Sequence, residues 1–397
     1  MRYNFDQIIN RRGTNSVKWD NGQLVKAYGV MDGFNNETIP VFTADMDFRC
    51  AQPVIDAITN VAQHGIYGYS AHLGNPDYDR SVQRWFRDRH DWDIPDGNIV
   101  YVNGTLEAIR LALKTWSEPG DGIMITRPVY GPFSTTIESC GRRIVNSDLI
   151  NTDGYYTMDF EDIERKAASE NIRIFLLCNP QNPTGRVWTM EELRSLAGIC
   201  EQNGVLLISD EVHCDIVRKG VHFVTAAKAG KSENTIVLNG INKTFNCAGL
   251  QCSNAIIQDE TLRHSFQVKA GMLLPSPFSI AAVIAAYTEG DEWLDQVLDY
   301  IDGTYDWVLN FMGKELPRVK VRKPEGTYVL WMDFRPTGLS AEQIHDRIYN
   351  RANVALEGGR NFDPDRGNGF ERICLPSPRS MIQEALFRIA EQFEDVR

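Results

Sequence analysis

The sequence has no run of basic residues and no apolar stretch long enough to cross a membrane. Its 397 residues include 41 lysines and arginines against 53 aspartates and glutamates, which gives a formal net charge of −12. An acidic chain without a basic run is poorly suited to bind nucleic acid or an anionic membrane surface. The longest apolar stretch, residues 271–287, contains two prolines and is shorter than the roughly 20 residues of a membrane span. We therefore expect neither nucleic acid nor a membrane as a partner.

Paired cysteines are also absent, because the eight cysteines are scattered and form no CxxC motif. Residues 1–16 have no apolar core and so do not resemble a secretory signal. Together these features indicate reduced, mostly buried thiols and a cytoplasmic location. His213 and Cys214 with Asp210 fit no standard zinc spacing, so we expect no metal.

What the sequence does contain is a series of short apolar runs that end in turn residues. They lie at residues 122–126, 172–178, 205–209 and 235–238. Runs that are apolar throughout indicate strands buried on both faces. Helical patterns lie between them, at 105–116 and after Thr189, which forms a capping box with Glu192. This alternation predicts an α/β fold with a mostly parallel sheet covered by helices on both sides.

The pattern changes near residue 290. A long amphipathic segment at 292–316 precedes a strand pair at 319–334, and a further strand-like run lies at 370–375. These elements predict a second, smaller α+β domain, and the chain is long enough for two or three domains. The expected domains comprise residues 47–287, and residues 1–46 with 288–397. A cleft between two domains is a natural ligand site.

Five chemically capable side chains follow four of the strand candidates. They are Tyr130, Asn182, Asp210, His213 and Lys243. In parallel sheets, ligands bind beyond the carboxyl ends of the strands. We therefore expect these side chains to meet at one edge of the sheet and to form an active site.

Lys243 follows the run 235–238 in a turn rich in glycine and asparagine. A lysine in a loop is usually a solvated surface residue. The alternative is an amine kept partly deprotonated by desolvation, which can form a Schiff base. Such a lysine points to pyridoxal 5′-phosphate (PLP). This cofactor needs a carboxylate at its ring nitrogen, a donor to its phenolic oxygen, a stacking ring and a phosphate cradle.

Each of these requirements has a candidate residue, and each candidate has a simpler interpretation. Asp210 suits the ring nitrogen, or caps a following helix. Asn182 in NPQNPTG suits the phenolic oxygen, or belongs to an ordinary turn. Tyr130 suits the ring face, or is a core or rim tyrosine. Gly104 and Thr105 suit the phosphate, or are an ordinary helix start.

A group that binds the substrate is expected beside the cofactor. Arg372 lies in the run 370–375 and can hold a carboxylate with its forked guanidinium. The alternative is a surface ion pair, for example with Glu371. The residues alone leave both interpretations open.

Taken together, the motifs resemble the fold-type I PLP enzymes of the aspartate aminotransferase superfamily. They are most similar to its cystathionine β-lyase branch, the MalY/PatB-type carbon–sulfur lyases. The motifs occur in the order of that branch over nearly the whole chain, as FTADMDF, YGYS, RPVYGPF, CNPQNPTGRVW, SDEVHCD, NKTFNCAGLQCS, PEGTYVLWMDF and RICLPSPRS. The resemblance implies a large domain with a mostly parallel seven-stranded sheet flanked by helices, plus a smaller α+β domain.

The resemblance also implies a role for each candidate residue. Lys243 is the Schiff-base lysine, Asp210 the partner of the ring nitrogen and Tyr130 the stacking ring. The other cofactor contacts implied are Gly104, Thr105 and Leu106 at the phosphate, Asn182 at the phenolic oxygen and His213 near the ring. Arg372 and the main-chain N–H of Ala44 bind the substrate carboxylate.

A homodimer with shared active sites is implied as well. Tyr69, or else Tyr67, matches the tyrosine that reaches the phosphate of a neighbouring subunit. The chain departs from the branch at two places. Asn239 to Asn242 replace a serine-rich lead into the lysine, so we expect an altered phosphate grip. Gly131 stands where many members have a second tyrosine, so we expect a more open pocket.

The activity that the resemblance implies is β-elimination from L-cystathionine, L-cysteine or a related S-substituted cysteine. The products are a thiol, pyruvate and ammonia. An aminotransferase that uses the same lysine is the alternative. A regulatory protein that uses the fold as a ligand sensor is a third possibility, against which the acidic charge argues.

Overall fold

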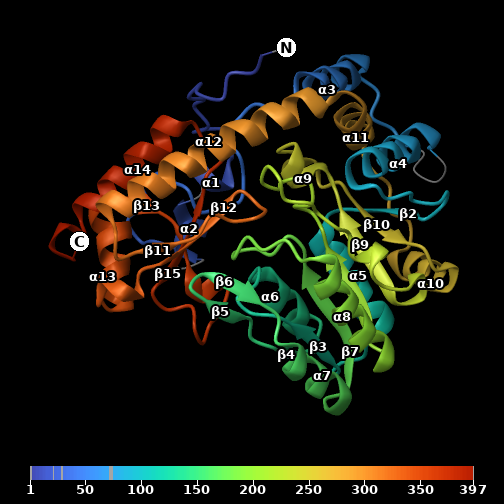
Figure 1. Ribbon diagram of the computed structural model, residues 1–397. Coiled ribbons are helices and arrows are strands. Elements are labelled where there is room, and N and C mark those ends of the chain that lie inside the picture. Colours follow the sequence, from blue (N-terminus) through green and yellow to red (C-terminus); the bar gives the residue numbers. More distant parts are fainter. Residues whose placement is uncertain (1, 21, 28–29, 71–74, 397) are drawn as a thin grey trace.

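The structure is a computed structural model that describes residues 2–20, 22–27, 30–70 and 75–396 (Figure 1). A seven-stranded sheet organises its larger part. The strand order is β2 (Ile99–Val102), β10 (Ser253–Ile257), β9 (Thr235–Asn239), β8 (Leu206–Asp210), β7 (Ile172–Cys178), β3 (Gly122–Ile125) and β4 (Arg143–Asn146). Strand β10 runs antiparallel to both of its neighbours, β2 and β9, whereas β4, β3, β7, β8 and β9 pair in parallel. The predicted mostly parallel sheet is confirmed.

Helices cover both faces of this sheet, as the apolar runs predict. On one face lie α5 (Thr105–Trp116), α6 (Pro132–Ser139) and α10 (Glu260–Ala270), which share a buried cluster with inward residues of the strands. On the other face lie α7 (Phe160–Ser169) and α8 (Met190–Gln202). The predicted capping box starts α8, because Thr189 Oγ1 accepts from Glu192 N at 3.2 Å and Glu192 Oε2 accepts from Thr189 N at 2.8 Å.

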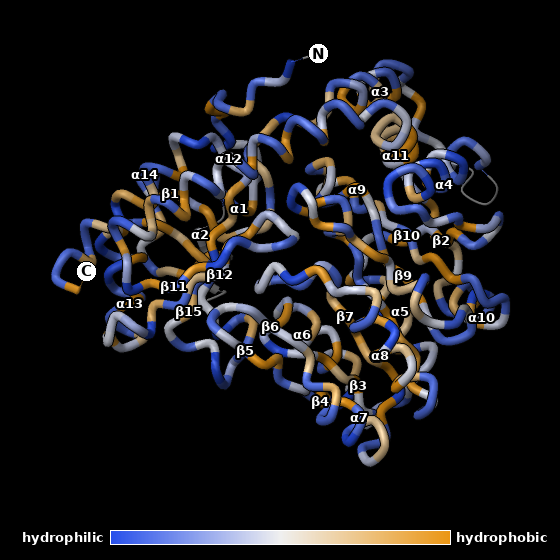
Figure 2. Tube along the Cα trace, viewed as in Figure 1, coloured by the Kyte–Doolittle hydropathy of each residue, from blue (hydrophilic) through white to orange (hydrophobic). Residues whose placement is uncertain are grey.

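Hydropathy follows this layering. In Figure 2 the central strands carry mainly hydrophobic colours, whereas helix α4 (Pro76–His90) is largely hydrophilic. Strands β8, β9 and β10 are buried at every position. Burial on both faces explains why these strands read as continuous apolar runs rather than as alternating patterns.

A second, four-stranded antiparallel sheet contains the predicted strand pair. Its order is β11 (Lys320–Val321), β12 (Val329–Asp333), β15 (Phe370–Cys374) and β14 (Glu357–Gly358). The helices around it are α12 (Asp291–Glu315), α13 (Ala341–His345) and α14 (Arg379–Glu391). In Figure 1 the long α12 extends from the neighbourhood of α11 (Pro277–Glu289) to these C-terminal elements. Its buried residues recur every three or four positions, which is the pattern of one apolar helix face.

The N-terminal segment packs with the C-terminal elements. Strand β1 (Ile39–Pro40) pairs in parallel with β13 (Val354–Ala355), and the blue N-terminal chain lies beside the orange and red elements in Figure 1. The remaining helices and strands are α1 (Val17–Asp20), α2 (Gly22–Ala27), α3 (Gln52–His64), α9 (Ile241–Thr244), β5 (Ile150–Thr152) and β6 (Tyr155–Thr157). No helix of the described residues has the length and apolarity that crossing a membrane requires.

Candidate active site

Lys243 lies in the short helix α9, directly after strand β9. The chain passes between them through Gly240, where a Cβ atom would lie 2.8 Å from Ser253 Oγ and 2.9 Å from the carbonyl oxygen of Cys252. Only glycine fits this close approach. The Lys243 ammonium donates to the carbonyl oxygen of Ala44 at 2.8 Å. The side chain of Lys243 therefore points into the protein, and the surface-lysine interpretation is wrong.

The surroundings of Lys243 lower the pKa of its ammonium group. Burial lowers the pKa of its ammonium, and the positive charge of Arg372 lowers it further, while Asp45 and Asp210 oppose both effects. A lysine whose pKa is lowered holds a larger fraction of free amine at neutral pH, which is the nucleophilic and basic form. This is the condition that the sequence-based hypothesis requires.

Asp210 ends strand β8 and is 4% exposed. It pairs in register with Cys178 and with Leu238 of the neighbouring strands, at the carboxyl edge of the sheet. Burial raises the pKa of its carboxyl group to about 6, against hydrogen bonds from Val212 and Thr105 and the charge of Lys243. Asp210 Oδ1 accepts from Val212 N at 3.2 Å in a turn. No helix begins there, so the helix-capping interpretation is wrong.

The predicted phosphate segment lies at the start of α5. Gly104 precedes the helix with φ 132°, and no side chain caps the helix. A positive φ favours glycine over residues with a Cβ. Thr105 is buried and Leu106 is partly buried. The first N–H groups of an uncapped helix have no acceptor within the helix, so they can donate to the oxygen atoms of a bound anion.

Arg372 is the most buried arginine of the site, at 1% exposure. Its Nη1 donates to Asn182 Oδ1 at 3.1 Å, and its Nη2 forms an ion pair with Glu357. Glu357 lies directly opposite Arg372 in the β14–β15 ladder. The Nε of Arg372 is buried without a partner among the described residues. The surface ion pair with Glu371 is therefore wrong as an interpretation, because Arg372 faces the interior and its ion-pair partner is Glu357.

Tyr130 and His213 line the same region. The Tyr130 ring is partly buried and packs edge-on against Phe133, with ring centroids 5.8 Å apart. His213 is buried, its Nδ1 has no described partner, and burial with the nearby charge of Lys243 lowers its pKa. Its ring packs edge-on against Tyr328 at 5.3 Å. Because His213 is neutral, it places no second positive charge beside the ammonium group of Lys243.

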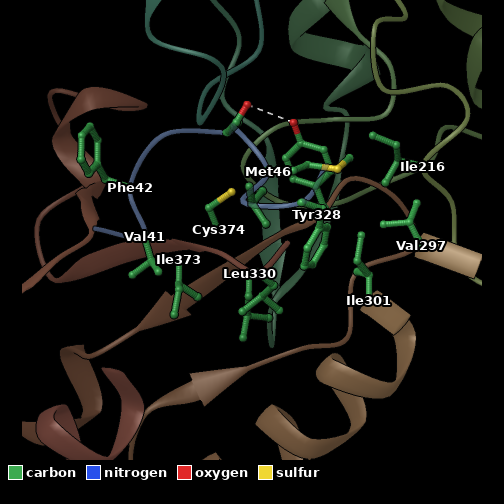
Figure 3. Packing of buried hydrophobic residues seen from close by; sticks show 14 of the residues in the cluster. Val41, Phe42, Met46, Ile216, Val297, Ile301, Tyr328, Leu330, Ile373 and Cys374 are labelled. Atoms are coloured by element: carbon green, nitrogen blue, oxygen red, sulfur yellow. Dashed lines mark hydrogen bonds between the residues drawn. The ribbon is translucent and has the colours of Figure 1, made fainter. Parts of the chain in front are cut away.

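The carbonyl of Ala44 receives two donors. Besides Lys243, Tyr328 Oη donates to it at 3.0 Å. Figure 3 shows Tyr328 surrounded by Met46, Ile216 and Cys374 within the buried cluster. The structure thus places Ala44 beside Lys243 through its carbonyl group. Its predicted role through the N–H group stays a prediction.

Two asparagines before Lys243 have buried amide atoms without a hydrogen-bond partner among the described residues. Asn242 Nδ2 donates to Ser253 Oγ at 2.9 Å, while its Oδ1 has no described partner. Asn239 Oδ1 accepts from Asn254 Nδ2 at 3.4 Å, and its own Nδ2 is buried without a described partner. These free amide atoms are consistent with an altered phosphate grip, which stays a prediction.

The expected opening at Gly131 is wrong. A Cβ atom there would lie 2.2 Å from the carbonyl oxygen of Asn361. The neighbouring backbone also meets this segment, because Val129 N donates to the carbonyl oxygen of Phe362 at 3.1 Å. The backbone around Asn361 therefore fills the space beside Gly131, and the missing side chain leaves no hole.

Tyr69 lies apart from the other candidates, at 97% exposure. Tyr67 is 55% exposed, and its hydroxyl donates to the carbonyl oxygen of Ala62 at 2.7 Å. Within the described part of the chain, neither tyrosine forms a hydrogen bond or a ring contact with Lys243 or with the start of α5. The other candidates are the ones that the fold brings together.

Sequence reasoning missed Glu357 and Tyr328. Tyr328 lies in the quoted motif PEGTYVLWMDF, but no local pattern relates it to a residue almost 300 positions earlier. Glu357 precedes two glycines in a short strand, a position without a period or motif of its own. Charge pairing with Arg372 was a possible signal, but it favours Glu371, which is adjacent to Arg372 in the sequence, over Glu357, which lies 15 positions away. Only strand register selects Glu357.

Comparison with known proteins agrees with this architecture. The family model for aminotransferase class I and II matches residues 41–389. Cystathionine beta-lyase PatB of Bacillus subtilis (strain 168) is 36% identical, over 97% of this chain and 98% of the relative. The PLP-bound C-S lyase from Staphylococcus hominis has a TM-score of 0.91 at 33% identity, covering 99% of both chains.

A second solved structure is similar to the same degree. The PLP-bound putative aminotransferase from Clostridium difficile 630 has a TM-score of 0.92 at 37% identity, and the match covers 99% of this chain and 100% of that one. Family model, relatives and structures thus agree over almost the whole length. The chain belongs to the aminotransferase class I and II family, with the fold of the fold-type I PLP-dependent enzymes.

Proposed function

We propose that the chain is a PLP-dependent carbon–sulfur β-lyase that cleaves L-cystathionine or related S-substituted cysteines to a thiol, pyruvate and ammonia. One observation carries the proposal. Asp210 and Lys243 lie at the carboxyl ends of β8 and β9 of the large sheet, and Arg372 on β15 of the small sheet donates to Asn182, so the two sheets bring these groups together. The C-S lyase and cystathionine β-lyase names of the similar proteins support the same reaction.

The residues present fit PLP. At neutral pH, Asp210 with a pKa of about 6 is mostly ionised, as a partner for a protonated ring nitrogen must be. No described residue accepts from Asn182 Nδ2, which leaves a donor for the phenolic oxygen. The uncapped start of α5 from Gly104 to Leu106 suits the phosphate. Tyr130 suits the ring face and His213 the ring surroundings.

When bound, PLP supplies an electron sink for the carbanion formed at the substrate Cα. The residues of the chain do the rest. Arg372 binds the substrate carboxylate, with the N–H of Ala44 as a second donor, and this fixes the direction of the Cα–H bond. Lys243, whose pKa is lowered by burial, takes the Cα proton as general base. The thiolate then leaves Cβ.

The decisive experiment combines Lys243→Ala with an assay for pyruvate released from L-cystathionine without any added 2-oxo acid. Loss of the general base predicts a fall in turnover of at least about 100-fold. Lys228→Ala is the control, because Lys228 forms an ion pair with Asp91 away from the site. Full activity in Lys243→Ala would refute the proposal. Borohydride treatment should fix the cofactor to Lys243 in the wild type only.

An aminotransferase is the second candidate, favoured by the similar structure of a putative aminotransferase. The same Lys243 would return a proton to the cofactor instead of supporting loss of a thiol. The two reactions separate in one assay. A lyase forms pyruvate from cystathionine without an acceptor, whereas an aminotransferase forms product only when a 2-oxo acid is present.

We also propose the assembly and the division into domains. Residues 47–287 form the large domain and residues 1–46 with 288–397 the small one, supported by the pairing of β1 with β13 and by a large sheet that lies within residues 99–257. A cytoplasmic homodimer is proposed, in which Tyr69 reaches the partner's phosphate site. The near-complete exposure of Tyr69 supports this role.

A further inference from the structure

Two thiols meet beside the candidate active site. The Sγ atoms of Cys50 and Cys247 lie 4.0 Å apart, although the residues are 197 positions apart in the chain. Cys247 follows Lys243 by four positions, and Cys50 follows the segment that carries Ala44. All eight cysteines are free, and no other two thiols of the described residues are hydrogen-bonded to each other. The contact is therefore specific to this pair.

A side-chain clamp holds the two segments together. Asn246 Oδ1 accepts from Met46 N at 3.1 Å, and its Nδ2 donates to the carbonyl oxygens of Met46 and Phe48, both at 3.0 Å. Asn246 has φ 57°, a left-handed conformation that asparagine tolerates better than most residues. The backbone on both sides of the thiol pair is thus positioned by three hydrogen bonds, and the approach of the sulfur atoms does not depend on mobile surface loops.

The two thiols differ in a way that suits successive reactions. Cys50 is partly exposed, whereas Cys247 is 4% exposed. The hydrogen bond from Cys247 lowers the pKa of the Cys50 thiol, and the nearby Arg11 guanidinium acts in the same direction. That hydrogen bond and burial raise the pKa of Cys247. We therefore expect Cys50 to be the thiolate that reacts with an oxidant first. The buried Cys247 is the second thiol, which reacts with the oxidised Cys50.

We propose that Cys50 and Cys247 form a reversible intramolecular disulfide when the protein meets a hydroperoxide. The Cys50 thiolate attacks the peroxide oxygen, which breaks the O–O bond and gives a sulfenic acid, with the other oxygen leaving as water or an alcohol. The Cys247 sulfur then attacks the sulfenic sulfur. Its proton leaves with the departing hydroxide as water, so two thiols are oxidised and one peroxide is reduced.

The geometry requires only a small adjustment. A disulfide has a sulfur–sulfur distance of about 2.05 Å, so the two Sγ atoms must close by about 2 Å. The bond would link the segment from Ala44 to Cys50 with the segment from Lys243 to Cys247. These are the two segments that the Lys243–Ala44 hydrogen bond already joins. The modification site thus borders the active site without using any of its proposed catalytic residues.

The test counts thiols in the holoenzyme, so its outcome does not depend on the proposed activity. After reduction, removal of reductant and treatment with hydrogen peroxide, titration in denaturant should fall from eight thiols to six. Dithiothreitol should restore all eight. Peptide mapping without reduction should find Cys50 joined to Cys247. An unchanged count, or a bond between other cysteines, would overturn the proposal.

Three variants sharpen the result. Cys50→Ser should keep all of its remaining thiols under the same treatment. Cys247→Ser should trap the sulfenic acid at Cys50, detected as a dimedone adduct. Cys140→Ser is the matched control, since Cys140 is buried elsewhere, and it should still lose two thiols. If Cys247→Ser fails to fold, Cys50→Ser decides alone, because loss of two thiols in that variant contradicts the proposal.

Discussion

Arg372, which is proposed to bind the substrate carboxylate, already forms an ion pair with the carboxylate of Glu357. Glu357 is paired with Arg372, and burial raises its pKa while Arg372 opposes that effect. An incoming substrate carboxylate therefore meets a neutralised pair, not a free cation. Two carboxylates that share one guanidinium repel each other. We therefore expect Glu357 to weaken the binding of amino acids, although it lies outside the motifs.

We predict that Glu357→Gln lowers KM for the amino-acid substrate roughly 3- to 10-fold, with little change in kcat, because the amide removes the competing charge. Steady-state kinetics measure this directly. Glu371→Gln is the matched control. Glu371 lies beside Arg372 on strand β15, and its pKa of about 8 leaves it mostly protonated at neutral pH, so the amide changes little. A higher KM in Glu357→Gln would mean that Glu357 orients Arg372 and does not compete.

Asp210 predicts a pH dependence of the cofactor-free protein. Its pKa is raised by burial from 3.8 to about 6, so the folded state binds its proton more tightly than the unfolded state does. The resulting stability is fully present below pH 3.8 and is lost as the pH rises through 6. We predict that Asp210→Asn is more stable than the wild type at pH 8, by about 3 kcal/mol.

Urea unfolding of the cofactor-free proteins at several pH values checks this prediction. The difference between Asp210→Asn and the wild type should shrink as the pH falls and should vanish well below pH 3.8, where the aspartate is protonated in both the folded and the unfolded state. The same variant should bind PLP more weakly, because an amide offers the ring nitrogen no negative charge. If Asp210→Asn were less stable at every pH, the carboxylate would be stabilising in the fold and burial would not be its dominant effect.

At the scale of elements, the loop after β3, which contains Gly131, packs closely against the segment before β15, which contains Asn361. Gly131 has no room for a Cβ because of the carbonyl of Asn361, which ends the short helical turn Gly359–Asn361. This turn follows Glu357 and so lies next to the strand that faces Arg372. A change at Gly131 therefore acts on the substrate side of the site through the backbone.

We predict that Gly131→Ala lowers the free energy of unfolding by about 1 to 3 kcal/mol, as overpacking does in a filled interior, and raises KM. Urea denaturation and substrate kinetics measure the two effects. Gly198→Ala in helix α8 is the control. A Cβ at Gly198 meets nothing within 4 Å, and alanine in a helix is favoured over glycine by up to about 1 kcal/mol. A neutral Gly131→Ala would show that the turn shifts freely.

At the scale of the whole molecule, the exposed Tyr69 predicts complementation between subunits. Lys243→Ala and Tyr69→Ala homodimers should both have low activity. A mixed dimer has one site with an intact Lys243 and the partner's intact Tyr69. Refolding an equal mixture should therefore restore activity, up to half the wild-type rate for each mixed dimer.

The outcome distinguishes two arrangements of Tyr69. If Tyr69 served its own subunit, every site of the mixed dimer would lack either Lys243 or Tyr69, and mixing would restore nothing. Sedimentation of the mixture verifies that mixed dimers form. A monomer in that measurement would refute the shared-site assembly directly.

Local signals in the sequence predicted the elements and most of the proposed site. The runs at 172–178 and 235–238 became β7 and β9 because continuous apolar residues suit strands buried on both faces. Residues at the ends of such strands meet wherever the sheet is parallel, so Asp210 and Lys243 were predictable without coordinates. Tyr69 and the N–H of Ala44 stay predictions, since they depend on a partner subunit and a substrate.

Tertiary structure alone decided which distant residues touch. The pairing of Arg372 with Glu357 depends on strand register, the filled space at Gly131 on a backbone carbonyl more than 200 residues away, and the Cys50–Cys247 contact on the Asn246 clamp. None of these contacts leaves a periodic or turn signal in the chain. The physical reason is that local patterns record which face of an element is buried, whereas packing between elements determines what each buried face meets.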